Sequence, residues 1–292
     1  MRKSLASLAI LSALSATSYA QQAAAPAAQS PHTFTGNVGL VTDYRFRGIS
    51  QTYKQPAIQG GFDYSHASGF YLGTWASNVS GNLYPGGAAM EWDFYGGYKW
   101  EPVKDLGLDV GLLHYYYPGS RYYNATLGKS GNKFDNTELY LGATYKWFSA
   151  KYSYALTDYF GIKTATYGGA CGFNSNGTAP TTGCLPATPG SSRGSGYLDL
   201  NANFEVMEKT TLGLHFGHTS VRHYGGLSYS DIKVGLTRDF GWATLGVAYI
   251  TTNAKAQFYR YGPPGLYATP QGTTENKDPT NGTLVLSIQK TF

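Results

Sequence analysis

Apolar and polar residues alternate along most of the chain from Phe34 to its end. In the stretch "FTGNVGLVTDYRF", one parity carries Phe34, Val38 and Leu40, and the other parity is largely polar or small. A second clear example is "MEWDFYGGYKW", in which Trp92 and the other large apolar residues share one parity. A period of two is typical of a β-strand with one apolar face.

Ten further stretches alternate in the same way, so the sequence predicts twelve strands. The connections between them also alternate in length. The short connections are 66–69, 101–105, the step at Trp147–Phe148, 207–210 and 239–242. The long connections are 47–56, 78–89, 118–135, 159–195, 219–229 and 253–282. Outer-membrane barrels pair short periplasmic turns with long extracellular loops, whereas a soluble β-sandwich has no reason to do so. We therefore predict an all-β fold, a 12-stranded antiparallel transmembrane β-barrel over residues 33–292.

The composition is unusual for a soluble globule. The chain has 26 Tyr and 38 Gly, and only 13% of its residues are charged, compared with about a quarter in typical soluble domains. No apolar run beyond the N-terminal segment is long enough for a transmembrane helix. In a barrel, apolar residues occupy every second position and so form no such run.

The N-terminal segment "MRKSLASLAILSALSATSYA" has the three parts of a secretory signal peptide. Two cations precede an apolar core, and a small-residue cleavage motif ends at Ala20. We predict a signal peptide over residues 1–20, a flexible leader over 21–32 and a location in the bacterial outer membrane. Removal of Arg2 and Lys3 lowers the formal net charge from +5 to +3, which is too mild to make nucleic-acid binding the default.

The stretch "DYRFRGIS", residues 43–50, mixes cations with aromatic residues. This mixture is found on single-stranded nucleic-acid surfaces, but it also fits one strand with two faces. Export and the surrounding alternation favour the strand. We expect Asp43 and Arg45 to face the lumen and Tyr44 and Phe46 to face the lipid boundary.

A family resemblance lies within the first third of the chain. The blocks "TDYRFRGISQ" (42–51), "PAIQGGFDY" (56–64) and "GFYLGTWASNV" (69–79) resemble the signature of the proteobacterial porin family labelled TorF or Gcw_chp. The resemblance implies an outer-membrane barrel and supplies no catalytic or ligand residues.

An aqueous lumen would give the inward-facing charges a function. The candidates to line the lumen are Asp43, Arg45, Asp63, Glu91, Asp93, Lys99, Asp109, Glu138, Lys146, Lys151, Asp199, Glu205, Asp231 and Lys233. Acids outnumber bases in this set, so an open lumen would favour cations. The alternative is that these groups pair across neighbouring strands and leave the lumen nearly neutral.

The other chemistry-bearing residues are few. Cys171 and Cys184 are the only cysteines, and an exported context favours a disulfide between them. We predict no metal site and no cofactor. His215 and His218 are three residues apart and thus on opposite strand faces. No phosphate-binding loop of the G-x-G-x-x-G type is present, and we predict no enzyme activity.

The predicted function is a porin-like outer-membrane channel for passive diffusion of small hydrophilic solutes. Twelve strands lie between the filled eight-stranded barrel and the wide sixteen-stranded porin, which favours a narrow pore. The expected partners are outer-membrane lipid and lipopolysaccharide, and the barrel-assembly machinery through the strand that ends at Phe292. The alternative is a barrel occluded by its loops, with 159–195 or 253–282 as the candidate plug, which acts as a structural or adhesive surface protein.

Overall fold

The computed structural model describes residues 30–81, 83–84, 88–124, 128–167, 190–259 and 277–292. Twelve strands form a closed antiparallel barrel in which each strand pairs with its neighbour along the chain and the last strand pairs with the first. The barrel strands are β1 (His32–Val41), β4 (Ala57–His66), β5 (Phe70–Asn78), β6 (Met90–Val103), β7 (Leu106–Tyr116), β10 (Asn136–Tyr145), β11 (Phe148–Ala155), β12 (Gly196–Met207), β13 (Thr210–Ser220), β14 (Tyr229–Asp239), β15 (Thr244–Thr252) and β16 (Thr283–Thr291). The predicted strand number and the closed fold are confirmed.

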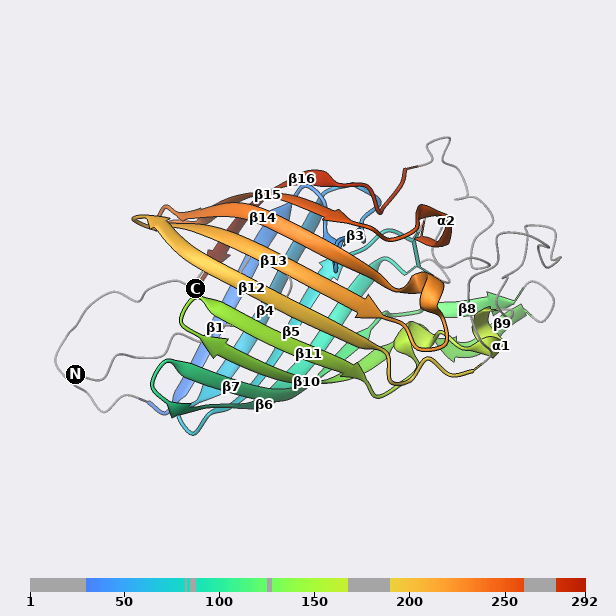
Figure 1. The fold of residues 1–292 in the computed structure, drawn as a ribbon, viewed down its shortest axis with the longest axis horizontal. Helices are drawn as coiled ribbons and strands as arrows, with labels where there is room; N and C mark the ends of the chain where they lie inside the picture. The colour runs from blue at the N-terminus through green and yellow to red at the C-terminus, as the bar shows by residue number, and fades with distance from the viewer. Residues whose placement is uncertain (1–29, 82, 85–87, 125–127, 168–189, 260–276) are drawn as a thin grey trace.

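Short turns lie at one end of the barrel and long connections at the other (Figure 1). β1 begins at the short-turn end, and the C-terminus lies at the same end, where Gly36 and Phe292 exchange backbone hydrogen bonds. The long connections carry the remaining elements. These are β2 (Arg45–Phe46), β3 (Ile49–Ser50), β8 (Arg121–Asn124), β9 (Gly128–Lys133), η1 (Tyr159–Gly161), α1 (Thr164–Tyr167), η2 (Gly225–Leu227) and α2 (Ala256–Tyr259). None of these helices is long and apolar enough to cross a membrane.

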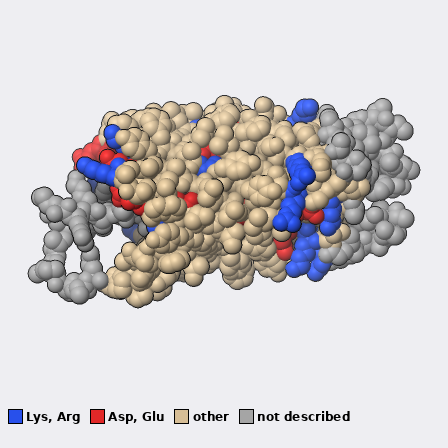
Figure 2. Space-filling model, turned by 60° about the horizontal axis from the view of Figure 1, so that its bottom comes forward, with Lys and Arg blue, Asp and Glu red and all other residues tan. Residues whose placement is uncertain are grey.

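The outer face of the barrel is apolar, as the alternation predicts. Phe62 is 66% exposed and Leu141 60% exposed, and both belong to the outward parity of their strands. Figure 2 shows a broad zone with few charged residues between two charged ends. A girdle of exposed aromatic residues follows the short-turn end, where membrane barrels place rings at the lipid–water interface. Its members include Phe34, Phe70, Trp100, Trp147, Phe148, Phe240, Trp242 and Phe292.

The first strand is shorter than the alternation predicts. It ends at Val41, and Tyr44 and Phe46 are buried inside the barrel rather than facing lipid. The expected orientation of these two rings is therefore wrong. The reason is that an alternating pattern requires only that one face meet an apolar surface, and here that surface is an aromatic cluster within the lumen.

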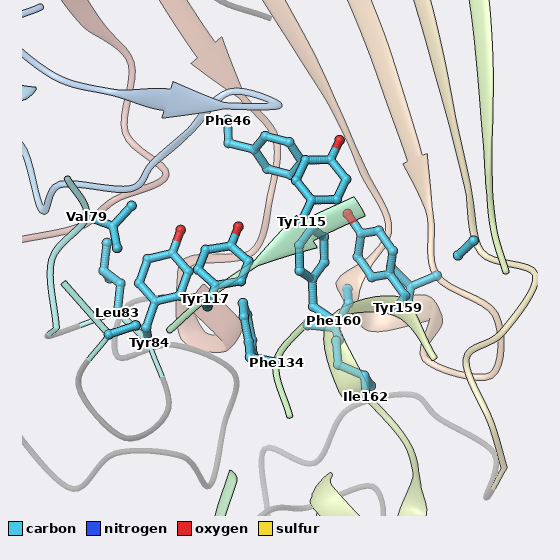
Figure 3. Packing of buried hydrophobic residues seen from close by; sticks show 14 of the residues in the cluster. Phe46, Val79, Leu83, Tyr84, Tyr115, Tyr117, Phe134, Tyr159, Phe160 and Ile162 are labelled. Atoms are coloured by element: carbon cyan, nitrogen blue, oxygen red, sulfur yellow. The ribbon is translucent and has the colours of Figure 1, made fainter. Parts of the chain in front are cut away.

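This aromatic cluster fills the barrel near its long-connection end (Figure 3). Phe46 makes edge contacts with Tyr115 and Phe160, at centroid distances of 5.5 and 5.8 Å. Tyr84 stacks on Tyr117 at 4.8 Å. Edge-to-face and offset stacks of this kind stabilise a packed interior beyond the burial of ring area alone. Most of the cluster's rings come from long connections, so this end of the lumen is packed by inward-folded chain.

Three predictions fall on residues outside those described. The signal peptide over 1–20 and most of the leader over 21–32 are among them. So is the disulfide between Cys171 and Cys184. These remain predictions.

Candidate functional site: the lumen and its inward-folded hairpin

Residues 43–54, called here the lumen hairpin, fold from the end of β1 into the barrel. β2 and β3 pair with Arg45 opposite Ser50 and Phe46 opposite Ile49. The two residues at the tip, Arg47 and Gly48, both have positive φ, at 47° and 81°. Two such residues are the mark of a type I′ hairpin turn, which glycine adopts freely and arginine at some cost in strain.

The side chain of Arg47 offsets this strain by binding the opposite wall. Its Nη2 donates to both carboxylate oxygens of Glu138 on β10, at 2.9 and 2.7 Å, and its Nη1 donates to the Tyr159 hydroxyl at 3.1 Å. The guanidinium also lies 4.2 Å from the ring centroid of Tyr197 on β12. Burial disfavours the charged guanidinium, but the Glu138 carboxylate and the hydroxyls of three neighbouring tyrosines together outweigh burial and raise the pKa of Arg47 well above its ordinary value. Arg47 thus links the hairpin to the barrel wall through a buried ion pair.

A second ion pair closes the base of the hairpin. Arg45 Nε donates to Asp43 at 2.7 Å, and Ser50 Oγ donates to the same carboxylate at 2.6 Å. Arg45 Nη1 also donates to the carbonyl of Pro279, in the connection before β16, at 3.1 Å. Both Asp43 and Arg45 are almost fully buried. They lie inside the barrel as expected, but on the hairpin rather than on the wall.

Two buried carboxylates of β6, those of Glu91 and Asp93, lie near the hairpin and form no ion pair with another described residue. The Tyr44 hydroxyl donates to Glu91 at 2.9 Å, and burial together with the charge of Glu91 raises the pKa of Tyr44 well above its ordinary value, so the phenol keeps its proton. Among the described atoms, the second oxygen of Glu91 and both oxygens of Asp93 have no hydrogen-bond partner. A buried charge without a partner costs free energy.

We expect Asp93→Asn to leave the free energy of unfolding unchanged within about 1 kcal/mol, or to raise it, because the change removes a carboxyl group whose ionisation is unfavourable at this buried position and breaks no side-chain hydrogen bond among the described atoms. The matched control is Asp199→Asn, which should lower that free energy by about 1.5–3 kcal/mol because Asp199 accepts charge-assisted hydrogen bonds. Urea unfolding of barrels folded in lipid vesicles measures both. Equal losses in the two variants would contradict this description of Asp93.

Below the hairpin, one wall of the lumen carries a polar network centred on His215 of β13. Its Nε2 lies 2.8 Å from Asp231 and its Nδ1 3.1 Å from Asp199. Lys151 lies 3.9 Å from Asp199, and the Tyr197 hydroxyl contacts His215 at 3.2 Å. Because Tyr197 also lies beneath Arg47, the network joins the hairpin tip to the wall.

The facing wall carries charged residues among tyrosines. Lys99 and Asp109 are cross-strand partners on β6 and β7, and the Lys99 ammonium lies 4.5 Å from the Tyr71 ring. The Tyr71 hydroxyl donates to Asp109 at 2.7 Å, and Tyr95 donates to Asp63 at 2.6 Å.

Inward glycines make room for the tyrosine rings in the lumen. A Cβ added at Gly73 would meet Tyr95, one at Gly111 would meet Tyr140, and one at Gly217 would meet Tyr197.

Most of the predicted lumen residues are inside the barrel. The exceptions lie at the short-turn rim. Lys146 is in the turn between β10 and β11, with positive φ and its ammonium over the outward ring of Tyr145, so its predicted place on the lumen wall is wrong. Glu205 has the inward parity but is exposed near the end of β12, where it accepts from the backbone of Lys209.

Two residues that the sequence did not single out are central to the site. The sequence predicts Arg47 only as the first residue of the long connection 47–56, although the dipeptide Arg47-Gly48 between apolar residues resembles a hairpin signal. The sequence predicts that His215 and His218 lie on opposite strand faces but indicates no role for His215, because its partners come from β12 and β14.

Comparison with known proteins gives a family and distant structural likenesses. A family model described as "Bacterial protein of unknown function (Gcw_chp)" matches residues 24–292. No curated protein matches the sequence. Among solved structures, the NanC porin is 10% identical with a TM-score of 0.47, over 88% of this chain and 98% of that one. The KdgM porin is 9% identical with a TM-score of 0.47, over 88% of this chain and 99% of that one. The outer membrane protein OpdK from Pseudomonas aeruginosa is 10% identical with a TM-score of 0.36, over 82% of this chain and 58% of that one. Likenesses at this level carry no argument about the cargo of this chain.

Proposed function

Because the chain belongs to the Gcw_chp family, which has no described function, we propose one from the geometry of its barrel. The protein is a narrow, porin-like outer-membrane channel for passive diffusion of small hydrophilic solutes, constricted by the lumen hairpin. The short-turn end faces the periplasm and the long connections face outward, the arrangement usual in outer-membrane barrels.

One observation carries this proposal. Five charged residues on the inward parity are only partly buried, although the barrel wall separates them from the outside: Asp63, Lys99, Asp109, Lys151 and Lys233. Charged groups are stable inside a barrel when water reaches them or when they pair, and their partial exposure supports water in the part of the lumen below the hairpin.

The charges support weak selectivity. Asp43, Glu138 and Asp199 each pair with a cation, so a count of acids overstates the negative field. Glu91 and Asp93 are buried behind Tyr44 rather than set on a path for ions. We propose at most a small preference for cations. Passive diffusion needs no catalytic residue and no cofactor.

The aromatic cluster at the long-connection end favours a second candidate. If the packed rings of Phe46, Tyr115 and Phe160 close the lumen at all times, the protein is an occluded barrel with a structural or adhesive role at the surface. The two candidates differ in whether solute crosses the folded barrel.

Swelling of liposomes that contain the folded protein separates the candidates. In isosmotic sugar solutions, a narrow channel should let a pentose enter and cause rapid swelling, while a trisaccharide should enter slowly. Liposomes with the same amount of heat-unfolded protein are the control. Swelling no faster than the control with every sugar would favour the occluded barrel.

A further inference from the structure

The outward face of β13 changes from apolar to polar along the strand. Leu214 and Phe216 belong to the apolar zone, at 38% and 41% exposure. The next two outward positions are His218 and Ser220, both exposed and polar, and the same parity leads to Arg222 in the following connection. Figure 2 shows several Lys and Arg side chains, with some Asp and Glu among them, at the long-connection end, directly beyond the uncharged zone. Cationic side chains therefore border the lipid-facing belt.

Arg222 and Arg193 lie together at this border. Both are exposed, and Arg222 Nη1 donates to the Arg193 carbonyl at 3.2 Å. His223 adds a third, partly buried group, with Nδ1 2.9 Å from the Ser191 carbonyl. These three residues, Arg193, Arg222 and His223, are called here the rim cluster.

The rim cluster stands beside an aromatic residue of the lipid-facing surface. A Cβ placed on Gly194 would lie 3.1 Å from the Tyr154 hydroxyl and 3.4 Å from Arg222 Nη1. Tyr154 is on the outward parity of β11 and 40% exposed. Tyrosine rings at this position mark the level of lipid headgroups, so the guanidinium of Arg222 is at that level too.

Unlike Lys163 near the same rim, the two arginines have no carboxylate partner among the described residues. In the ranges that the structure describes, neither Arg193 nor Arg222 forms an ion pair. Asp158 is a neighbouring acid, but it accepts a hydrogen bond from Ser191 and pairs with Lys163 at 3.5 Å. Planar guanidinium groups that keep their donors available match phosphate oxygens in geometry and charge.

We propose that the rim cluster binds the phosphate groups of lipopolysaccharide in the outer leaflet. This inference rests on the proposed outer-membrane location. A lipid is favoured over a soluble anion because the cluster adjoins the lipid-facing belt. There the guanidinium groups bind the phosphate of a lipid while the acyl chains of the same lipid pack against the apolar face.

Binding of lipid A to the folded barrel in detergent, followed by native mass spectrometry, tests the proposal. The wild type should bind bisphosphorylated lipid A more tightly than lipid A from which the phosphates have been removed. Arg193→Gln with Arg222→Gln should weaken binding of the phosphorylated form by roughly tenfold or more, since each surface cation contributes on the order of 1 kcal/mol. Arg238→Gln is the matched control, because Arg238 is an exposed arginine at the opposite rim.

Inorganic phosphate at millimolar concentration should not displace the lipid; displacement would show a free-anion site instead. Equal affinity of the double variant and the wild type, or equal affinity for both forms of lipid A, would overturn the proposal. Conductance of the same preparations separates this inference from the channel function. Phosphate-dependent binding without conductance would contradict the channel function and support lipid binding by the rim cluster. Conductance without phosphate-dependent binding would support the channel function and contradict lipid binding by the rim cluster.

Discussion

Replacing Glu138 by glutamine should raise the single-channel conductance of the barrel several-fold. The Glu138 carboxylate accepts two hydrogen bonds from Arg47 at the tip of the lumen hairpin. Its loss leaves a buried guanidinium without a counter-charge, which costs about 3–5 kcal/mol. The left-handed backbone at Arg47 adds strain that the ion pair no longer offsets. We expect the hairpin to leave the lumen in a large fraction of molecules, since solvent then hydrates Arg47.

Recordings in planar bilayers at symmetric salt measure this effect. Glu205→Gln is the matched control, because it makes the same chemical change at an exposed rim position and should leave conductance as in the wild type. Heat-modifiable gel mobility verifies that each variant folds. If folded Glu138→Gln conducts as the wild type does, then the ion pair does not hold the hairpin, and the contacts of Phe46 with Tyr115 and Phe160 are sufficient.

Replacing Leu200 by arginine should impair folding far more than replacing its neighbour Asn201. Leu200 faces outward and is 38% exposed in the apolar zone, where an arginine near mid-membrane costs about 2–4 kcal/mol. Asn201 faces inward and donates to Asp199 at 2.6 Å, so an arginine there has a carboxylate within reach. Val110→Arg on β7 should behave as Leu200→Arg does.

The folded fraction in lipid vesicles over a range of urea concentrations measures this difference. Leu200→Arg should unfold at clearly lower urea than the wild type, and Asn201→Arg should stay near the wild type. Similar tolerance at the two positions would mean that the outer surface of β12 does not meet lipid, contrary to the transmembrane orientation.

The sequence predicts the barrel well because parity is a local property. The outward positions of β6 and β12 could be assigned from the alternation around Trp92 and Leu200, since every second residue must meet lipid. The same locality explains the error at Tyr44 and Phe46. Their alternation continues that of β1, and nothing in the local pattern distinguishes a ring against lipid from a ring against Tyr115 inside the barrel.

The lumen chemistry was predictable only in part. The parity correctly placed Asp199 and Lys151 inside the barrel, but their pairing with each other and with His215 depends on the register of three strands. The partner of Arg47 is 91 residues away on the opposite wall, a contact that no spacing rule indicates. The alternative of paired lumen charges agrees with the geometry at these residues. The excess of acids in the sequence does not indicate this pairing, because a count of charges carries no information on which of them are neighbours.

Single-channel recording of the wild-type protein in a planar bilayer with a salt gradient tests the central claim, that this barrel is a narrow channel constricted by its lumen hairpin. We predict discrete, small conductance steps with a reversal potential close to zero and displaced slightly in the direction of cation selectivity. A bilayer that stays silent, with folding of the same preparation verified by heat-modifiable mobility, would contradict the channel and identify an occluded surface barrel.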